Sequence, residues 1–411
     1  MKGKILFISV LVVIIASLVL VGCQTPTTTP PTKTPPTTTT PPATTGVIKI
    51  GHIRPITGHM AISGTRMIKG FQVAIDEAGG VVAGKKLEVI VEDDAAKPEM
   101  AVDKARKLIE QDKVSIIIGP TVGGSQMAVS AYMNKVGVPL MHTNPSPAGV
   151  IFEKHAWTIQ AAGAEPQEPS VQARYAYEQA GVKKVTCITA DWAPGHGFMD
   201  AFMNTFKKLG GQVIQEQYPP VASPDFAPYL ANMKDADACV AWFDGTDAVK
   251  FLSQYQEFGL WKRMPIVPTF HGSFFAPFLI SQLPPAAQEP IKGRYGPTPY
   301  LAGIDNPTNK RFLEICKEKL KTVPDENESG PYSGAMMLMA ALKATNGDTT
   351  PAVLKKAIVD LSIEVPDGPV KFDKEKSSAI RNIYIGKFEK AGGQIVQTPL
   401  FTYKEVPAMG F

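Results

Sequence analysis

The sequence has 411 residues, of which 44% are hydrophobic and 19% charged. This composition excludes an intrinsically disordered chain and a multi-span membrane protein. The first 46 residues hold three lysines and no acidic residue, so the remaining 365 carry 39 basic and 38 acidic side chains, a formal charge of +1. That near-neutral body lacks the basic surface with which nucleic-acid-binding proteins neutralise phosphates.

The first residues have the pattern of an export signal. Met1–Lys4 carries two lysines, and Ile5–Val21 is almost wholly apolar, which is typical of a secretory signal. Leu20-Val21-Gly22-Cys23 resembles a lipobox, where bacterial lipoproteins are acylated and then cleaved before the cysteine. We therefore predict a signal peptide over residues 1–22 and lipidation of Cys23. An uncleaved anchor is the alternative, and either places the body outside the cytoplasm.

Residues 23–46 are predicted to form a linker after the lipidated cysteine. Gln24–Thr45 contains twelve threonines and seven prolines in 22 residues. Proline fixes φ and removes backbone donors, so this stretch cannot pack and stays extended. We expect it to act as a tether.

The body then alternates strands with helices. We predict strands over 47–53, 87–92, 114–119 and 138–141, with helices between them near 68–78, 102–109 and 125–135. Parallel neighbours need helical crossovers, so this order predicts a parallel, doubly wound sheet. The pattern restarts with strands over 184–190, 213–218, 238–243 and 266–270, and helices over 198–209, 226–233 and 248–258.

The last part of the chain breaks this rhythm. We predict helices over 311–321 and 333–345 and strands over 370–373 and 382–389. A body of this length exceeds what one hydrophobic core usually supports, so we predict two lobes with a chain that crosses between them more than once.

The body resembles the extracytoplasmic solute-binding proteins of ABC importers, in the leucine/isoleucine/valine-binding branch. The resemblance covers roughly Val47–Lys404 and rests on the order and spacing of short fragments: 48–51 with Thr57-Gly58, 70–80, 92–94, 118–120, 137–139, 368–373 and 386–388. It implies an α/β type I periplasmic binding protein fold, with two Rossmann-like lobes whose doubly wound parallel sheets are joined by three crossovers.

The resemblance also implies the extent of each lobe. The N-lobe would comprise residues 47–160 and 298–371, and the C-lobe residues 161–297 and 372–411. The crossovers would lie near Ile159–Gly163, Gly296–Pro299 and Val370–Asp373.

Ligands of open parallel sheets bind beyond the carboxyl ends of the strands. In the N-lobe this places Val122, Gly123, Gly124 and Ser125 at a strand-to-helix turn, where glycines allow close approach and helix N–H groups can receive a carboxylate. A plain turn with an N-cap serine is the alternative. By resemblance, Thr143, Asn144 and Ser146 would contact the ligand from the next loop, and Ser63 would line the mouth of the first loop.

In the C-lobe the resemblance points to Trp192, Asp244, Phe270 and His271. Trp192 would lie against an apolar part of the ligand, and core packing is its alternative. Amino-acid binders of this family carry an acid after the fourth C-lobe strand, but residues 268–272 contain none. Either Asp244 pairs with the ligand ammonium, or the ligand has no ammonium.

We therefore predict a monomeric, lipid-anchored protein on the bacterial cell membrane that captures a small solute and delivers it to an ABC transporter permease. A branched-chain or other hydrophobic amino acid is the first ligand candidate. An aromatic or aliphatic carboxylic acid or an amide is the alternative, as is a sensor role without import. No hydrolase, P-loop or zinc-protease motif is present, and the histidines are scattered, so we expect no enzyme, no metal site and no cofactor.

Overall fold

The computed structural model describes residues 46–411 except 59, 153–154, 244, 269–283 and 392–393. Residues Ala43–Phe411 form one compact unit. Within the described ranges no helix is long and apolar enough to cross a bilayer. The predicted signal peptide and Cys23 lie outside the described residues, so export and lipidation stay predictions.

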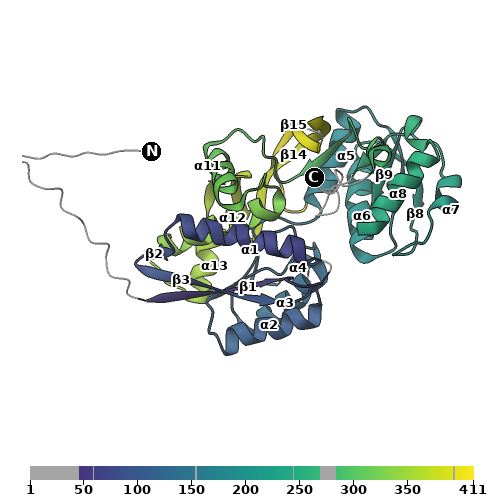
Figure 1. The fold of residues 1–411 in the computed structure, drawn as a ribbon. Helices are drawn as coiled ribbons and strands as arrows, with labels where there is room; N and C mark the ends of the chain where they lie inside the picture. The colour runs from purple at the N-terminus through teal and green to yellow at the C-terminus, as the bar shows by residue number, and fades with distance from the viewer. Residues whose placement is uncertain (1–45, 59, 153–154, 244, 269–283, 392–393) are drawn as a thin grey trace, which may run out of the picture. The chain divides into compact units, whose positions relative to one another are not determined.

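Strands and helices alternate through most of this unit (Figure 1). Its first elements are β1 (Val47–Arg54), α1 (Ala61–Glu77), β2 (Val81–Val82), β3 (Lys85–Asp93), α2 (Pro98–Glu110), β4 (Ile116–Ile118), α3 (Gly123–Val136), β5 (Leu140–His142), α4 (Gly149–Phe152) and β6 (Thr158–Gln160). The next are α5 (Gln167–Glu178), β7 (Lys184–Thr189), α6 (Ala193–Lys208), β8 (Gln212–Gln217), α7 (Ala227–Ala231), β9 (Ala238–Trp242), α8 (Gly245–Glu257), η1 (Leu260–Lys262) and β10 (Ile266–Pro268). The last are α10 (Pro285–Gln288), β11 (Tyr295–Thr298), α11 (Pro307–Ile315), η2 (Cys316–Leu320), α12 (Glu326–Ala344), α13 (Pro351–Val359), β12 (Ser362–Val365), β13 (Gly368–Asp373), β14 (Ser378–Ala391) and β15 (Gln394–Val406).

The described strands form two sheets, as the α/β prediction requires. The large sheet has eleven strands, with β12-β13-β14-β6-β5-β4-β1-β3-β2 along its main path and β11 and β15 paired to β14. Its central pairs from β3 to β6 are parallel. The small sheet has the order β10-β9-β7-β8 and is parallel throughout.

The long strand β14 pairs with several other strands of the large sheet. It pairs with β6 in parallel at Ser378 and with β11, β13 and β15 in antiparallel register. The segments around β6, β11 and β13, where we predicted the three crossovers, therefore all adjoin one strand.

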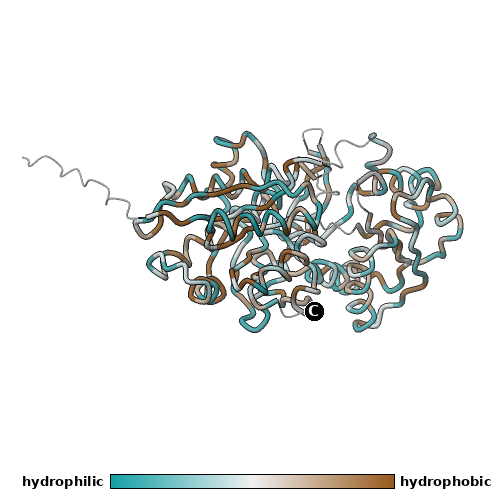
Figure 2. The backbone as a smooth tube through the Cα atoms, turned by 90° about the horizontal axis from the view of Figure 1, so that it is seen from below, coloured by the Kyte–Doolittle hydropathy of each residue, from teal (hydrophilic) through white to brown (hydrophobic). Residues whose placement is uncertain are grey.

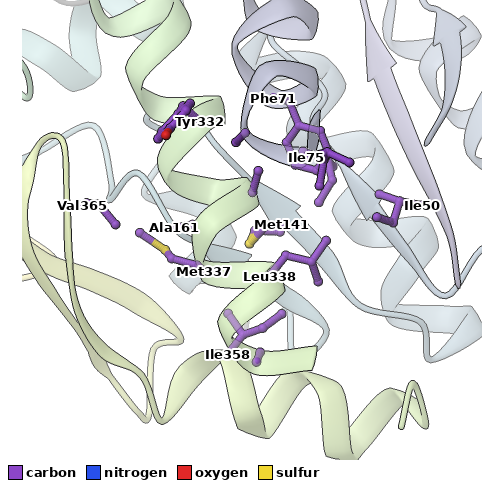
Figure 3. Packing of buried hydrophobic residues seen from close by; sticks show 14 of the residues in the cluster. Ile50, Phe71, Ile75, Met141, Ala161, Tyr332, Met337, Leu338, Ile358 and Val365 are labelled. Atoms are coloured by element: carbon purple, nitrogen blue, oxygen red, sulfur yellow. The ribbon is translucent and has the colours of Figure 1, made fainter. Parts of the chain in front are cut away.

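The largest apolar cluster packs α1, α11, α12 and α13 against the large sheet. Figure 3 shows Phe71 and Ile75 of α1 in this cluster with Leu338 of α12 and Met141 of β5. Full burial of a side chain such as Phe71 contributes about 1.5–3 kcal/mol. In Figure 2 the hydrophobic colour follows several strands, whereas the outer turns are largely hydrophilic.

Several helices differ from their predicted bounds: α1 begins at Ala61 rather than near residue 68, α6 begins at Ala193 rather than at 198, and two helices in the last part of the chain differ as well. The helix predicted over 333–345 begins already at Glu326, because Asp325 and Glu328 form a capping box that starts it seven residues earlier, and Pro331 is accommodated inside it. The helix predicted over 311–321 is α-helical only to Ile315 and continues as a π-helical turn. The sequence pattern also left other elements unassigned, namely β2, α4, β6, α5, η1, α10, β11, α13, β12 and β15.

Candidate functional site

A cavity of about 620 Å³ opens among loops that follow strands of both sheets. The volume lies within the range of about 300–1,000 Å³ typical of small-molecule sites. Its lining includes residues after β4 and β5 of the large sheet and after β7 and β9 of the small sheet. This is where ligands of open α/β sheets bind, beyond the carboxyl ends of parallel strands.

The first wall of the cavity is the N-terminus of α3. Val122, Gly123 and Gly124 line it. No side chain caps this helix, and the first N–H groups of any helix lack an acceptor within it. The turn therefore presents backbone donors and the positive end of a helix dipole at the cavity wall.

Ser125 follows in the same helix but does not line the cavity. Its side chain is fully buried, and its Oγ has no hydrogen-bond partner among the described residues. A contact between this hydroxyl and a ligand stays a prediction.

The second wall is the loop after β5. Thr143 and Asn144 line the cavity. Helix α12 approaches Thr143 closely because two of its positions have no side chain. A Cβ at Gly330 would lie 2.4 Å from the Thr143 carbonyl oxygen, and one at Gly334 would lie 2.4 Å from Thr143 Cγ2. The close approach of α12 therefore leaves no room for a side chain at either position beside Thr143.

Ser146, predicted from the same loop, lies outside the lining. It is fully buried and accepts a hydrogen bond of 2.7 Å from Nε2 of Gln160 on β6. Ser63, on α1, is also buried and outside the lining, whereas Met60 and Met67 on either side of it contribute to the cavity.

Two indoles form the wall on the side of the small sheet. Trp192, the N-cap residue of α6, lines the cavity, and its ring stacks on that of Trp242 at 5.5 Å and 21°. Trp242 ends β9 and stacks in turn on Phe198 at 5.5 Å. Trp242 therefore stacks on two other rings, and this packing restricts the positions that the indoles of the apolar wall can take.

Acidic side chains also line the cavity. Asp247 lines it and accepts a hydrogen bond of 2.8 Å from the backbone N–H of Ala222. Glu165 lines it near α3, where its Oε1 lies 3.7 Å from the position of a Cβ on Gly123. Asp244, Phe270 and His271 lie outside the described residues.

A buried ion pair closes the base of the cavity. Arg381 and Asp367 both line it, and Nη2 of Arg381 lies 2.9 Å from Oδ2 of Asp367. Arg381 also donates to the carbonyl oxygens of Ala162 at 3.0 Å and Pro299 at 3.2 Å. One side chain on β14 therefore ties the segments after β6 and β11 to the turn before β13. Burial raises the pKa of Asp367, although the charge of Arg381 opposes the rise.

Several lining residues were not predicted from the sequence. They are Met60, Met67, Gln126, Glu165, Trp242, Asp247, Pro299, Asn327, Asp367 and Arg381. Trp242 and Asp247 lie at the two ends of the loop after β9. The predicted strand over 238–243 does indicate the position of this loop. Asp367 and Arg381 belong to a hairpin far along the chain, and no local motif marks them.

The buried groups near the cavity give no sign of a metal centre. No cluster of three or more His, Cys, Asp or Glu in the described part of the chain could hold a metal ion. Burial, with added repulsion from Arg54 and His155, lowers the pKa of His142 to about 3, so this imidazole is neutral at physiological pH. Cys187, Cys239 and Cys316 are buried free thiols.

Comparison with known proteins gives one family. The family model described as periplasmic binding protein matches residues 47–394. The Leu/Ile/Val-binding protein homolog 6 of Brucella melitensis is 27% identical over 353 residues, which cover 84% of this chain and 88% of that protein.

Solved structures agree with this match. An ABC transporter substrate-binding protein from Sphaerobacter thermophilus superposes with a TM-score of 0.81 at 28% identity, covering 87% of this chain and 98% of the other. A solute binding protein of an ABC transporter from Rhodopseudomonas palustris BisB5, in complex with 3,4-dihydroxybenzoic acid, gives a TM-score of 0.78 at 30% identity. That match covers 88% of this chain and 98% of the other.

Proposed function

This chain belongs to the periplasmic binding protein family and is a substrate-binding protein of an ABC transporter, and from that premise we propose that it captures a small aromatic carboxylate. The observation that carries the proposal is the division of the cavity into two ends. One end presents the uncapped N-terminus of α3 and the hydroxyl of Thr143, and the other presents the indoles of Trp192 and Trp242. A planar ring with one carboxylate matches both ends.

The contacts assign a role to each end. The N–H groups at Gly123 and Gly124 and the Thr143 hydroxyl would receive the carboxylate oxygens, since charge-assisted hydrogen bonds to backbone donors are strong. The Trp192 indole would lie along the ligand ring. Support comes from the relative that is 30% identical and binds 3,4-dihydroxybenzoic acid.

A hydrophobic amino acid such as leucine is the second candidate. The carboxylates of Glu165 and Asp247 line the cavity and offer partners for an ammonium group. The Brucella relative named as a Leu/Ile/Val-binding protein homolog also supports this candidate. We expected from the sequence that Asp244 would pair with a ligand ammonium, but Asp244 lies outside the described residues. In this proposal Asp247 or Glu165 pairs with the ammonium instead.

A thermal-shift panel on residues 43–411 tests both candidates after bound ligand is stripped by partial unfolding and dialysis. The panel holds 3,4-dihydroxybenzoate, benzoate, leucine, isoleucine, valine and 4-methylpentanoate. At 100 times Kd a ligand adds about 2.7 kcal/mol of stability, which gives a clear shift. A response to the benzoates supports the first candidate and a response only to leucine-type amino acids supports the second. A flat response to the whole panel refutes both.

The lobes and their motion form part of this proposal. We assign residues 47–160 and 298–371 to the N-lobe, and 161–297 and 372–411 to the C-lobe. The lobes close over the ligand about the crossovers that Arg381 links, because a ligand that contacts both stabilises the closed form by its differential affinity. The closed form docks on the permease and releases the ligand chemically unchanged. Small-angle scattering with and without ligand would measure the closure, and NMR of the recovered ligand would reveal any turnover.

Family membership places the protein outside the cytoplasm, and we propose that a lipid on Cys23 holds it at the cell membrane as a monomer. The signal-like residues 1–22 and the threonine- and proline-rich linker support this arrangement. Labelled palmitate should be incorporated into the wild type but not into Cys23→Ser, whose signal peptide should stay uncleaved because acylation precedes cleavage. A wild type that incorporates no label would show that a lipid on Cys23 is not the anchor.

A further inference from the structure

A positive charge lies buried directly behind the cavity wall. Arg54, the last residue of β1, is fully buried. Its Nη1 donates to Oγ1 of Thr121 at 3.2 Å and to Oδ1 of Asn144 at 3.0 Å, and its Nη2 donates to Oγ1 of Thr143. Nη1 also contacts Sδ of Met67 at 3.3 Å. All four partners line the cavity, so the guanidinium is separated from it by one layer of side chains.

No carboxylate pairs with this guanidinium anywhere in the described ranges. Arg381, the other buried arginine among the described residues, pairs with Asp367, and the partly buried Arg66 pairs with Asp325 and Glu328. Burial lowers the pKa of Arg54 to about 9, against the attraction of Asp94, which acts without an ion pair. The guanidinium therefore stays charged at neutral pH.

The remaining contacts of Arg54 do not neutralise it. Its Nε donates to Nε2 of His52 at 3.0 Å. Burial and the Arg54 charge hold the pKa of His52 well below its usual range, so the imidazole is neutral. An unpaired buried charge is costly, and an anion that arrives nearby relieves that cost.

Arg54 also sets the polarity of the cavity wall. Its N–H groups occupy oxygen lone pairs of Thr121, Thr143 and Asn144, so the hydroxyl protons of the two threonines must point away from it. The proton of Thr121 has an acceptor in Sδ of Met67 at 3.5 Å. Thr143 is thereby held as a hydrogen-bond donor, the polarity that a carboxylate requires.

We propose that Arg54 is a positioning residue that determines ligand specificity by making the site select a carboxylate over the corresponding neutral carboxamide. It acts through its charge, which no ion pair among the described residues neutralises, and through the orientation of Thr143. The inference rests on the proposed function, since it takes this cavity as the ligand site. It holds for either ligand candidate, because aromatic acids and amino acids both carry a carboxylate.

Isothermal titration calorimetry on residues 43–411 tests the inference. The probes are 3,4-dihydroxybenzoate and 3,4-dihydroxybenzamide, with leucine and leucinamide as a second pair. The wild type should prefer the acid of the pair it binds by at least about tenfold. Arg54→Gln should bring the acid-to-amide ratio of Kd values close to one, whereas Arg54→Lys should keep most of the preference. A purely structural role would weaken acid and amide alike and leave the ratio unchanged.

The control variant is Arg106→Gln, which removes the same charge from an exposed position on α2 and should leave the ratio unaltered. If Arg54→Gln does not fold, Thr143→Val removes the hydroxyl that links Arg54 to the cavity and should also narrow the ratio. A wild type that binds no acid of either pair overturns the proposed function and this inference together. Equal binding of acid and amide by the wild type would overturn this inference alone. The same would follow if a folded Arg54→Gln variant kept the wild-type preference for the acid.

Discussion

Replacing Arg381 with methionine removes the cation from a buried ion pair and should destabilise the protein strongly. The side chains of Arg381 and Asp367 are only 2% and 3% exposed, so the carboxylate left behind is poorly solvated. Removing one partner of such a pair costs about 3–5 kcal/mol. The carbonyl groups of Ala162 and Pro299 lose a donor as well, which adds to the loss.

Urea unfolding of residues 43–411, followed by circular dichroism, measures this loss. The double variant Arg381→Met with Asp367→Asn should recover a substantial part of it, because no uncompensated charge then remains. The exposed Arg106→Met is the matched control and should change the unfolding free energy by less than about 0.5 kcal/mol. A loss under about 1 kcal/mol for Arg381→Met, or a double variant as unstable as the single one, would refute the reasoning.

The pH dependence gives a second check on the same pair. Burial raises the pKa of Asp367 in the folded state, and loss of the Arg381 charge raises it further. A carboxyl whose folded pKa exceeds its unfolded value destabilises the fold above the folded pKa, and this penalty disappears as the pH falls toward the unfolded value. The stability gap between wild type and Arg381→Met should therefore narrow as the pH is lowered. A gap that widens would contradict the assignment.

Three further predictions follow from the site and its surroundings. Trp192→Ala should weaken binding of an aromatic carboxylate by about tenfold in calorimetry, and Trp192→Phe should retain most of the affinity; equal affinity for Trp192→Ala and wild type would remove the indole from the site. Gly334→Ala should lose about 1–3 kcal/mol in urea unfolding, because its Cβ meets Thr143, whereas Gly197→Ala on α6 has nothing within 4 Å and should lose nothing. A thiol reagent should not label the three buried cysteines, Cys187, Cys239 and Cys316, until urea unfolds the protein, because burial raises the pKa of each thiol. Rapid labelling of the native protein would instead show that the thiols are accessible.

The alternation of strands and helices was predictable because the spacing of apolar residues that marks each element lies within a short stretch of sequence. The order β-α-β-α implies parallel strands, and the carboxyl ends of parallel strands meet at one edge of a sheet. Val122, Thr143 and Trp192 were expected near a ligand on this ground together with the family resemblance, and all three line the cavity. Ser125 and Ser146 lie on the same segments but face the interior, because position on a loop does not fix side-chain direction.

The remaining lining depends on contacts between distant segments, which no local pattern encodes. In the sequence, Arg54 is a polar residue at the end of a predicted strand. Only the folded structure brings Thr121, Thr143 and Asn144 next to it. Arg381 reads as an ordinary residue of a hairpin strand, yet it meets carbonyl groups more than 80 positions away. The start of α12 is an intermediate case, since its capping-box residues Asp325 and Glu328 are visible in the sequence while Gly330 and Pro331 suggest a break.

The central claim is that the cavity holds a carboxylate at the N-terminus of α3 and an apolar group against Trp192. A crystal structure of residues 43–411 with 3,4-dihydroxybenzoate, or with leucine if the thermal-shift panel selects it, tests this most directly. The carboxylate oxygens should lie within hydrogen-bond distance of the Gly123 or Gly124 N–H and of the Thr143 hydroxyl, and the ring or side chain should lie along the Trp192 indole. A carboxylate bound instead at Arg381, or a ligand outside this cavity, would contradict the claim.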